Sequence, residues 1–452
     1  MRAAFRTLLC HFVRDRRGNI AVIFALACVP LITVVGCAVD YSRATQIRSK
    51  LQAAADAASV GSIAKASPAF AAAGTMTSDG SIAVGVTDAR NIFNANVANQ
   101  TGYTPGTVTP TVVKSGSTVT STVTFSATVN TMFLGVIGKT SLALTGTSTA
   151  TATMPLYVDF YLLLDNSPSM GVAATPTDIT NMQARTGGCA FACHDTTKAA
   201  GTSNYDIAKA NGITTRIDVV RQASANLMDT ARNTQTYTNQ FRMAIYDFGG
   251  ASATIGLRNL FSLSSSLTSA KTAAGSIDLM AVAGQNDAYT ADKDTPFTTI
   301  FPAINNEIAS PGPGTSASPL KYLFLVSDGV ADETNSGKTM CSVSSAAYPL
   351  YTPTNRCQSP INPALCKTLK DRGIKIAVLY TTYQPPTDNW YSTWIAPFNA
   401  GTWGPSPNSK IAQNMQACAS PGLYFEVSPT QGISDAMNAL FKKAVADARI
   451  SG

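Results

Sequence analysis

An acidic residue and two hydroxyl residues occupy alternate positions directly after the apolar run YLLL at 161–164. They are Asp165, Ser167 and Ser169 in the segment DNSPS. Carboxylate and hydroxyl oxygens are hard ligands of the kind that Mg²⁺ prefers, and Mg²⁺ takes about six ligands, some of which remain water. One loop therefore supplies only part of a metal site, and the other protein oxygens must come from neighbouring loops.

Two further loops offer such oxygens. Thr295 stands just before a predicted helix, and Asp328 follows the apolar run YLFLV in the segment SDG. Thr298 and Thr299 are alternatives to Thr295, but Thr295 precedes a proline at a plausible first helical position. Gly329 permits the tight turn that an exposed aspartate at a strand end requires. The sequence thus provides oxygen donors on three separate loops.

Short apolar runs alternate with helical patterns from Leu156 onward, which predicts an α/β fold with a mainly parallel sheet flanked by helices. The expected strands are 156–164, 241–248, 322–327, 374–380 and 423–427. The expected helices are 217–233, 297–308, 363–372 and 433–448. Loops at the carboxyl ends of parallel strands form the usual ligand edge of such a sheet, so the three loops should meet there.

The segment DNSPS, a threonine on a middle loop and the aspartate of LVSDG together resemble the metal-ion-dependent adhesion site of von Willebrand factor A-type domains. The resemblance implies a Rossmann-like, von Willebrand A-type fold over residues 155–452. It also implies bound Mg²⁺, or Mn²⁺ or Ca²⁺, whose ligand shell is completed by an acidic residue of a protein partner. The implied metal ligands are Asp165, Ser167, Ser169, Thr295 and Asp328.

The net charge of +7 is concentrated at the N-terminus. Residues 1–50 hold eight Lys and Arg against two Asp, or +6, which leaves 25 − 24 = +1 for the other 402 residues. The body therefore offers no basic field to phosphates, and nucleic-acid binding is not expected.

Residues 20–39 form an apolar run without a charged side chain, long enough to cross a hydrocarbon core of about 30 Å. A basic leader, 1–19, precedes this predicted transmembrane helix. The positive-inside rule therefore predicts a single-pass protein with a cytoplasmic N-terminus and an exported body. A cleaved signal peptide and a lipoprotein signal are the alternatives.

Two regions separate the predicted span from the α/β domain. Residues 40–66 are rich in alanine, lack proline and place apolar residues at helical spacing, which predicts a stalk helix continuing from the membrane. Residues 67–154 are rich in Thr, Ser and Val in period-2 alternation, which predicts a small β-rich or α+β module. That module carries no residues that suggest chemistry.

The segments RDRRGNIAVIFALACVPLI and AVDYSRATQIRSKLQAAADAAS resemble the TadE/TadG-like proteins of the tight-adherence (Flp) pilus apparatus. A TadG-like protein joins such an anchor to a von Willebrand A-type domain, so the two resemblances are compatible. They imply a protein of the bacterial inner membrane with a periplasmic body, whose partners are pilus-assembly or pilin-like subunits.

Nine cysteines are divided between the two ends of the chain, and three lie before or inside the predicted span. The other six can pair in 15 ways, which the sequence does not distinguish. Two of them belong to an insertion at about 171–215 that also contains His194, but zinc is disfavoured because the body has no other histidine. The candidates for disulfides are Cys189, Cys193, Cys341, Cys357, Cys366 and Cys418.

Two alternatives compete with a metal-dependent binding role. DNSPS alone is compatible with an ordinary polar turn, which would make the domain a metal-independent scaffold. An aspartyl phosphohydrolase would use Asp165 as nucleophile, but Ser167 stands where that chemistry usually needs a second acid. Neither a nucleophile elbow nor a Walker loop is present, so an enzyme is not expected. Asp247, Asp332 and Glu333 are expected on solvated loops.

Overall fold

The computed structural model describes residues 19–76, 78–284, 287–334, 341, 355–383, 391–399, 409–428 and 432–451. Most of the predicted basic leader therefore lies outside the described residues. The chain divides into two compact units, Met1–Met154 and Pro155–Gly452.

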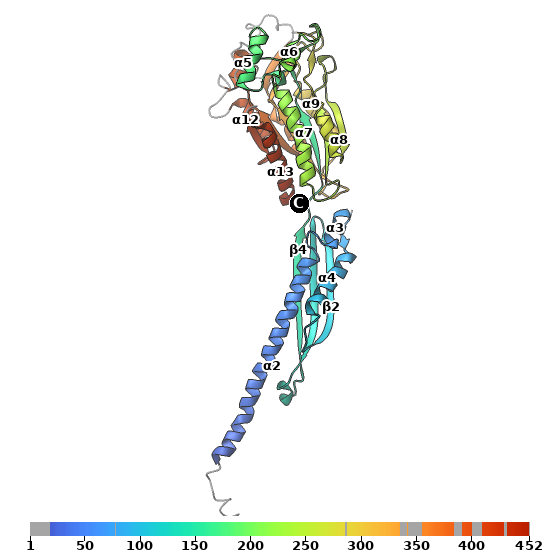
Figure 1. The fold of residues 1–452 in the computed structure, drawn as a ribbon, viewed down its shortest axis with the longest axis vertical. Coiled ribbons are helices and arrows are strands. Elements are labelled where there is room, and N and C mark those ends of the chain that lie inside the picture. The colour runs from blue at the N-terminus through green and yellow to red at the C-terminus, as the bar shows by residue number, and fades with distance from the viewer. Residues whose placement is uncertain are drawn as a thin grey trace, which may run out of the picture. The chain divides into compact units, whose positions relative to one another are not determined.

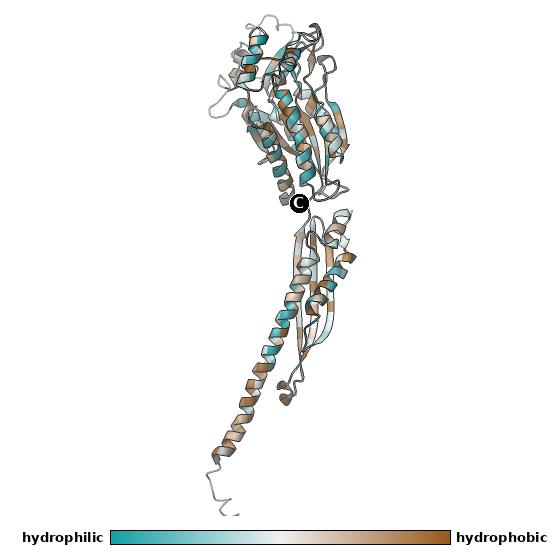
Figure 2. Cartoon of the chain, in the orientation of Figure 1, coloured by the Kyte–Doolittle hydropathy of each residue, from teal (hydrophilic) through white to brown (hydrophobic). Residues whose placement is uncertain are grey.

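The first unit begins with a 43-residue helix, α2 (Asn19–Gly61). At 1.5 Å per residue it is about 65 Å long. Its first half is apolar on every side, as Figure 2 shows, and its second half carries polar residues. Among the described residues, this helix is the single one long and apolar enough to cross a membrane. The helix ends at Gly61, so the predicted stalk is five residues shorter than expected.

An antiparallel sheet with the order β1-β2-β3-β4 packs against the second half of α2 (Figure 1). One stripe of α2, which includes Ile47, Leu51 and Ala58, is buried against side chains of β3 such as Val123 and Phe125. The first unit is therefore an α+β module built around the helix. Its other elements are α3 (Pro68–Thr75), β1 (Gly80–Ser81), α4 (Ala83–Val97), β2 (Thr104–Ser115), β3 (Thr118–Asn130), η2 (Leu134–Ile137) and β4 (Ser141–Thr153).

The second unit is built on a six-stranded sheet with the order β14-β13-β10-β5-β7-β8. All neighbouring strands are parallel except β7 and β8, so one edge strand is antiparallel. If the six strands are numbered along the chain and the sheet is followed from β8 to β14, the order is 3-2-1-4-5-6, which is that of doubly wound folds. The strands are β5 (Val158–Leu164), β7 (Phe241–Asp247), β8 (Arg258–Ser264), β10 (Leu320–Ser327), β13 (Lys375–Thr381) and β14 (Tyr424–Val427).

Helices cover both faces of this sheet, which confirms the predicted α/β class. One face packs against α7 (Arg216–Thr234), α8 (Leu267–Ala274) and α13 (Ile433–Ser451). The other packs against α9 (Phe297–Glu307), α10 (Pro363–Asp371), α11 (Ala396–Asn399) and α12 (Lys410–Cys418). This mainly parallel sheet between two helical layers agrees with the Rossmann-like fold that the resemblance to von Willebrand A-type domains implied, with the antiparallel β8 at the sheet edge.

The central strand β5 has no exposed residue, because both of its faces lie under helices. Phe160 and Leu162 face one layer, and Tyr161 and Leu163 face the other. Its one charged residue, Asp159, is buried and bound by Lys321 and by Arg242 at 2.7 Å. The strand is thus fixed on every side, and the loop that follows it starts from a rigid position.

The segment between β5 and α7 is more ordered than the sequence suggested. It contains η3 (Pro168–Gly171), α5 (Pro176–Arg185), β6 (His194–Asp195) and α6 (Asn204–Ala210). The two short helices begin with side-chain caps from Thr175 and Ser203. Further short elements are η4 (Ser252–Thr254), β9 (Ala281–Val282), β11 (Val330–Thr334), β12 (Arg356–Pro360) and η6 (Tyr391–Ile395).

Candidate metal centre at the carboxyl edge of the sheet

Asp165 lies immediately after β5 and is completely buried. Its Oδ1 accepts hydrogen bonds from the amide of Ser167 (2.9 Å) and from the Ser167 hydroxyl (2.6 Å). Its Oδ2 accepts one from the hydroxyl of Ser327 at 2.6 Å. The hydroxyls of Ser167 and Ser169 are 3.2 Å apart, so the three predicted donors of the first loop form one connected group.

Asp328, at the end of β10, is also completely buried and lies close to Asp165. Burial, and then the charge of Asp328, raise the pKa of Asp165 to about 7, whereas hydrogen bonds from Ser167 and Ser327 oppose this shift. Two neighbouring carboxylates without bulk water are unfavourable unless positive charge is supplied nearby. This pair, with its serine hydroxyls, provides the hard oxygen ligands that suit a divalent cation.

A cationic side chain already lies at this site. Arg216, the first residue of α7, is completely buried, and its Nη1 lies 3.4 Å from Oδ2 of Asp328. The hydroxyl of Tyr383 donates to the same oxygen at 2.6 Å, and the Arg216 guanidinium stacks over the Tyr383 ring at 4.2 Å. Nη2 of Arg216 donates to the carbonyl of Thr382 at 2.8 Å. Arg216 could not be identified from the sequence, because it lies 112 residues from its partner Asp328.

Thr295 is brought to the same edge by a backbone bridge to Asp332, with an N–H···O distance of 3.1 Å in each direction. Thr295 is buried, whereas Thr298 and Thr299 are exposed. Thr298 is also bonded elsewhere, because its hydroxyl donates to Glu333. Of the three threonines, Thr295 is therefore the one placed toward the metal loops.

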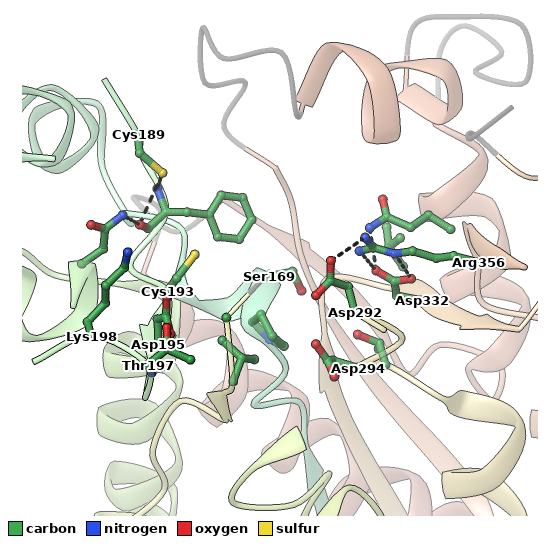
Figure 3. A pocket seen from close by; sticks show the side chains of 18 of the residues that line it. Ser169, Cys189, Cys193, Asp195, Thr197, Lys198, Asp292, Asp294, Asp332 and Arg356 are labelled. Carbon is green, nitrogen blue, oxygen red and sulfur yellow. Dashed lines mark hydrogen bonds and ion pairs between the residues drawn. The ribbon is translucent and has the colours of Figure 1, made fainter. Parts of the chain in front are cut away.

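A cavity of about 770 Å³ opens above the site, and Ser169 and Thr295 are among its lining residues. Figure 3 shows Ser169 between two walls. One wall comes from the insertion, with Cys193 and Lys198, and the other from the loop before α9 and the β11–β12 hairpin, with Asp332. A partner residue could therefore approach the serine and threonine hydroxyls, while the two carboxylates stay buried below.

Asn166 is a structural residue of the site that sequence reasoning missed. Its Nδ2 donates to the carbonyls of Gly249 (2.7 Å) and Asp278 (3.1 Å), and its Oδ1 accepts from the amide of Phe248 (3.0 Å). These three bonds tie the first metal loop to the end of β7 and to the segment before β9. The signal was present in the sequence, since Asn166 lies inside the motif between two candidate ligands.

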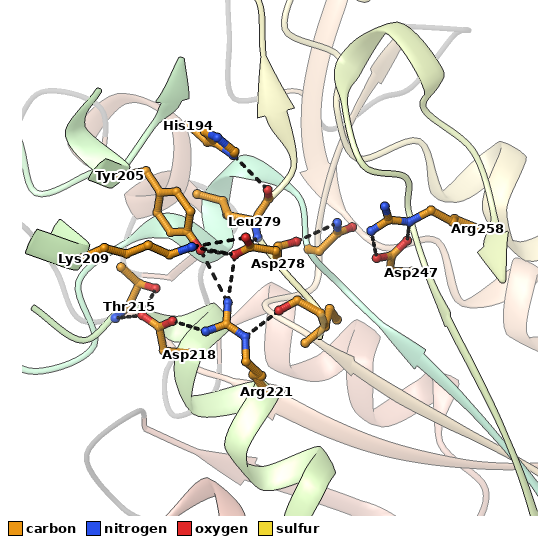
Figure 4. Close-up of polar contacts among 12 residues, drawn as sticks. His194, Tyr205, Lys209, Thr215, Asp218, Arg221, Asp247, Arg258, Asp278 and Leu279 are labelled. Carbon is orange, nitrogen blue, oxygen red and sulfur yellow. Dashed lines mark hydrogen bonds and ion pairs between the residues drawn. The ribbon is translucent and has the colours of Figure 1, made fainter. Parts of the chain in front are cut away.

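Asp278 in turn connects this region to the insertion, as Figure 4 shows. Its carboxylate accepts hydrogen bonds from Tyr205 and from Arg221 (2.8 Å), and it pairs with Lys209 at 3.2 Å. Burial by itself would raise the pKa of Asp278, but the hydrogen bond from Tyr205 and the charge of Lys209 lower it overall. The insertion is thus held to α7 and to the metal loop by one ionic cluster.

The acids expected on solvated loops are instead buried and bonded. Asp247 is paired with Arg258 (Nε–Oδ1, 2.8 Å), and Asp332 is bound by Arg356 (Nε–Oδ1, 2.7 Å). Glu333 is buried too and accepts from the N-terminus of α9. The prediction of solvated loops was therefore wrong, because packing buries each acid beside an arginine or a hydrogen-bond donor of another element.

Four of the six candidate cysteines form disulfides: Cys341 with Cys357, and Cys366 with Cys418, each with a Cα–Cα distance of 5.1 Å. Cys189 and Cys193 belong to neither disulfide. Burial raises the pKa of Cys193 to about 12, so its side chain is a neutral thiol. Among the described residues, no group of three or more His, Cys, Asp or Glu side chains is clustered closely enough to hold a metal ion.

Residues 18–63 match the family model of putative Flp pilus-assembly TadE/G-like proteins. The N-terminal region is TadE/G-like. The TadE/G-like region includes all of α2, and therefore the predicted span and the part of the predicted stalk that is helical. No curated protein matches the chain.

Solved structures similar to this chain include the vWF domain of the type V pili tip protein Mfa5 from Porphyromonas gingivalis, at 10% identity and a TM-score of 0.36, covering 65% of this chain and 97% of that one. BatB from Bacteroides thetaiotaomicron is 13% identical with a TM-score of 0.32, covering 64% and 99%. The PilB minor pilin from Streptococcus sanguinis is 11% identical with a TM-score of 0.36, covering 74% and 77%. The assignment of the second unit to the doubly wound α/β class rests on its strand order and not on these similarities.

Proposed function

We propose that this protein is a membrane-anchored envelope protein of tight-adherence (Flp) pilus assembly or adhesion, and that its second unit binds an acidic residue of a partner through a divalent cation. The TadE/G-like region supports the pilus role. The observation that carries the binding role is the buried pair Asp165 and Asp328, with serine hydroxyls at one end of a cavity.

In this proposal Asp165, Ser167, Ser169, Thr295 and Asp328 hold Mg²⁺, or Mn²⁺ or Ca²⁺, directly or through water. The cation supplies a positive charge that a partner carboxylate can reach from the cavity. Ser169 and Thr295 line that cavity, so a carboxylate entering between its walls would meet the metal on their side. Pilus-assembly or pilin-like subunits are the proposed partners.

The protein is proposed to lie in the bacterial inner membrane, with residues 20–39 crossing the bilayer once and the body in the periplasm. The apolar first half of α2 supports the anchor. The two disulfides in the second unit support an oxidising compartment for the body.

A metal-independent scaffold is the second candidate, and the Arg216–Asp328 ion pair favours it. A buried guanidinium beside Asp328 already neutralises one carboxylate without any metal. A hydrolytic role is not proposed, because both oxygens of Asp165 accept hydrogen bonds from serines and the carboxylate is fully buried. Such an oxygen is poorly placed to attack phosphorus.

The test is thermal unfolding of the full chain in detergent, in EDTA and then in millimolar Mg²⁺, Mn²⁺ or Ca²⁺. A cation that binds the native state must raise the unfolding midpoint by mass action. At a hundredfold excess of the cation over its Kd, the free energy of unfolding increases by about 2.7 kcal/mol. Wild type should respond, and Asp165→Asn should not. The conservative amide keeps the shape of the carboxylate, so loss of the response is not merely loss of the fold.

Ser169→Ala is the second variant, because Ser169 lines the cavity and its removal leaves the bonds of Asp165 to Ser167 and Ser327 intact. Ser266→Ala, on an exposed helix start outside the site, is its control. A weaker cation response in Ser169→Ala alone supports the metal site. If wild type shows no response to any of the three cations, the scaffold is the correct function.

A further inference from the structure

The turn between β3 and β4 carries an unusual concentration of exposed apolar side chains. Met132 is 72% exposed, Val136 77% and Ile137 62%, and none of the residues of η2 is buried. We call residues 132–137 the hairpin tip. An exposed apolar patch on a folded unit generally marks a surface that contacts a partner or a membrane.

The hairpin tip is held firmly against α2. The carboxylate of Asp40 accepts hydrogen bonds from the amides of Met132 (3.0 Å), Phe133 (2.8 Å) and Leu134 (2.8 Å). Gly36 is buried beneath Phe133, and a Cβ added to it would come within 2.5 Å of the phenylalanine side chain. A glycine in α2 thus lets the tip pack closely on the helix.

This attachment sets the position of the tip along the predicted membrane span. Gly36 lies inside the apolar run 20–39, three residues before its end. At 1.5 Å per residue, Phe133 therefore contacts the helix about 5 Å inside the hydrocarbon boundary. Asp40, the first charged residue after the run, binds the tip at the boundary itself. Figure 2 shows apolar residues at the end of the hairpin and on the adjoining part of α2.

We propose that the hairpin tip inserts into the bilayer, in the leaflet from which the chain emerges toward the body of the protein. The tip would then be a second membrane contact beside α2. This inference rests on the proposed membrane anchor. Val34, Val35 and Val39 are exposed on α2 at the level of the tip, so the tip and the span share one environment. If that environment is hydrocarbon for the helix, it is hydrocarbon for the tip as well.

The residues that flank the tip suit this role. Lys139, exposed just after η2, can extend its ammonium group to lipid phosphates while its stem remains in apolar surroundings. Much of the tip backbone is hydrogen-bonded, because the Asp40 carboxylate accepts from three of its amides and carbonyls of the turn accept from the amides of Val136, Gly138 and Lys139. Backbone groups must be bonded in this way before a non-helical segment can enter lipid.

Two contacts with the bilayer would restrict how the first unit moves. A single helix anchor can tilt and rotate about its own axis, whereas a helix with an attached apolar tip has a fixed rotation. The sheet of the first unit would then keep one orientation relative to the membrane plane. Such an orientation is useful to a subunit that must present a surface to a membrane-bound assembly.

The experiment uses the full chain reconstituted in vesicles of phosphatidylethanolamine and phosphatidylglycerol that contain a phospholipid with a diazirine on its acyl chain. After irradiation, lipid adducts are mapped on peptides by mass spectrometry. We expect adducts in residues 20–39 and in residues 132–137. Val136→Lys should lower the yield at the tip by about fivefold, since a lysine near the interface is unfavourable there, and should leave the yield at 20–39 unchanged.

Val84→Lys is the matched control, because Val84 is an exposed valine of the same unit (49%) near the opposite end of β3. It should change neither yield. Adducts at 20–39 without adducts at 132–137 would overturn the tip proposal and leave the anchor standing. Absence of adducts from both segments would overturn the anchor too. Benzoylphenylalanine at position 136 that cross-links to protein instead of lipid would assign the tip to a protein partner.

Discussion

Arg216 and Asp328 form an ion pair in which both side chains are completely buried, with 3.4 Å between Nη1 and Oδ2. The aspartate is one of the proposed metal ligands, so the site contains an internal cation next to the position of an external one. The two cations do not exclude each other, because Asp165 and Asp328 together supply two negative charges and Arg216 supplies one positive charge. With both carboxylates ionised, one negative charge remains for a metal to neutralise.

Arg216→Met should destabilise the protein in EDTA by about 3–5 kcal/mol, the cost of leaving a buried charge without its partner. It should also enlarge the gain in stability from Mg²⁺, because the two carboxylates then lack any other cation. Chemical denaturation in EDTA and in Mg²⁺ measures both effects. Arg232→Met removes a half-exposed arginine from its pair with Asp229 and should cost less than about 1 kcal/mol. An unchanged or smaller Mg²⁺ effect in Arg216→Met would contradict the electrostatic account.

Asn166→Ala should weaken cation binding although Asn166 is not a proposed ligand. The substitution removes three buried hydrogen bonds that hold the first metal loop to its neighbours. At about 1 kcal/mol for each bond, the loss of stability is about 3 kcal/mol. Calorimetric unfolding at several Mg²⁺ concentrations separates the loss of stability, which is seen without Mg²⁺, from the weaker cation binding, which is seen in the dependence on Mg²⁺. Asn96→Ala, an exposed asparagine in the first unit, should leave both stability and Mg²⁺ response near wild type.

Acid should release the insertion from the rest of the second unit. The pKa of Asp278 is lowered in the folded state, so its contribution is complete above its unfolded pKa of about 3.9 and is lost as the pH falls through the folded value. Asp278→Asn removes this contribution, so the variant should be less stable at neutral pH and lose less stability on acidification. Unfolding midpoints between neutral pH and pH about 3 measure the difference. Parallel curves for wild type and variant would rule out this role for the ionic cluster.

The two disulfides should contribute unequally. Cys366–Cys418 joins α10 to α12 across 52 residues, and Cys341–Cys357 closes a separation of 16. By the chain-entropy account, replacing the first pair with serine costs about 4 kcal/mol and replacing the second about 3 kcal/mol. Denaturant titrations of the two double variants, with the reduced wild type for comparison, give the values. The reverse order would show that local contacts, rather than chain entropy, determine the effect.

Much of the second unit could be predicted from hydrophobic patterning. The expected strand at 241–248 is β7, Phe241–Asp247, and the expected helix at 217–233 is α7, Arg216–Thr234. Buried parallel strands read as continuous apolar runs, which are easy to find. The antiparallel strand β8 was missed, because an edge strand is only partly buried and its residues are mixed in polarity.

The candidate site was predictable in part for a related reason. Ligands of one loop, such as Asp165, Ser167 and Ser169, are near each other in sequence and follow a visible strand. Asp328 could be added because the carboxyl ends of parallel strands share one edge of the sheet. Arg216 and Tyr383 could not, because neither belongs to the motif, and their contact with Asp328 depends on how α7 packs over the sheet end.

The sequence by itself determined the apolar helix at the N-terminus, the α/β pattern of the body and the loop that carries Asp165, because each depends on the pattern of apolar and polar residues within a short stretch of the chain. Only the tertiary structure decided what neutralises Asp328 and where the β3–β4 turn lies on α2. The bond from Phe133 to Asp40 joins residues 93 apart in sequence. Such pairings arise when folding brings distant groups out of water, and a buried charge or amide must then bond to whatever polar group the packing places beside it.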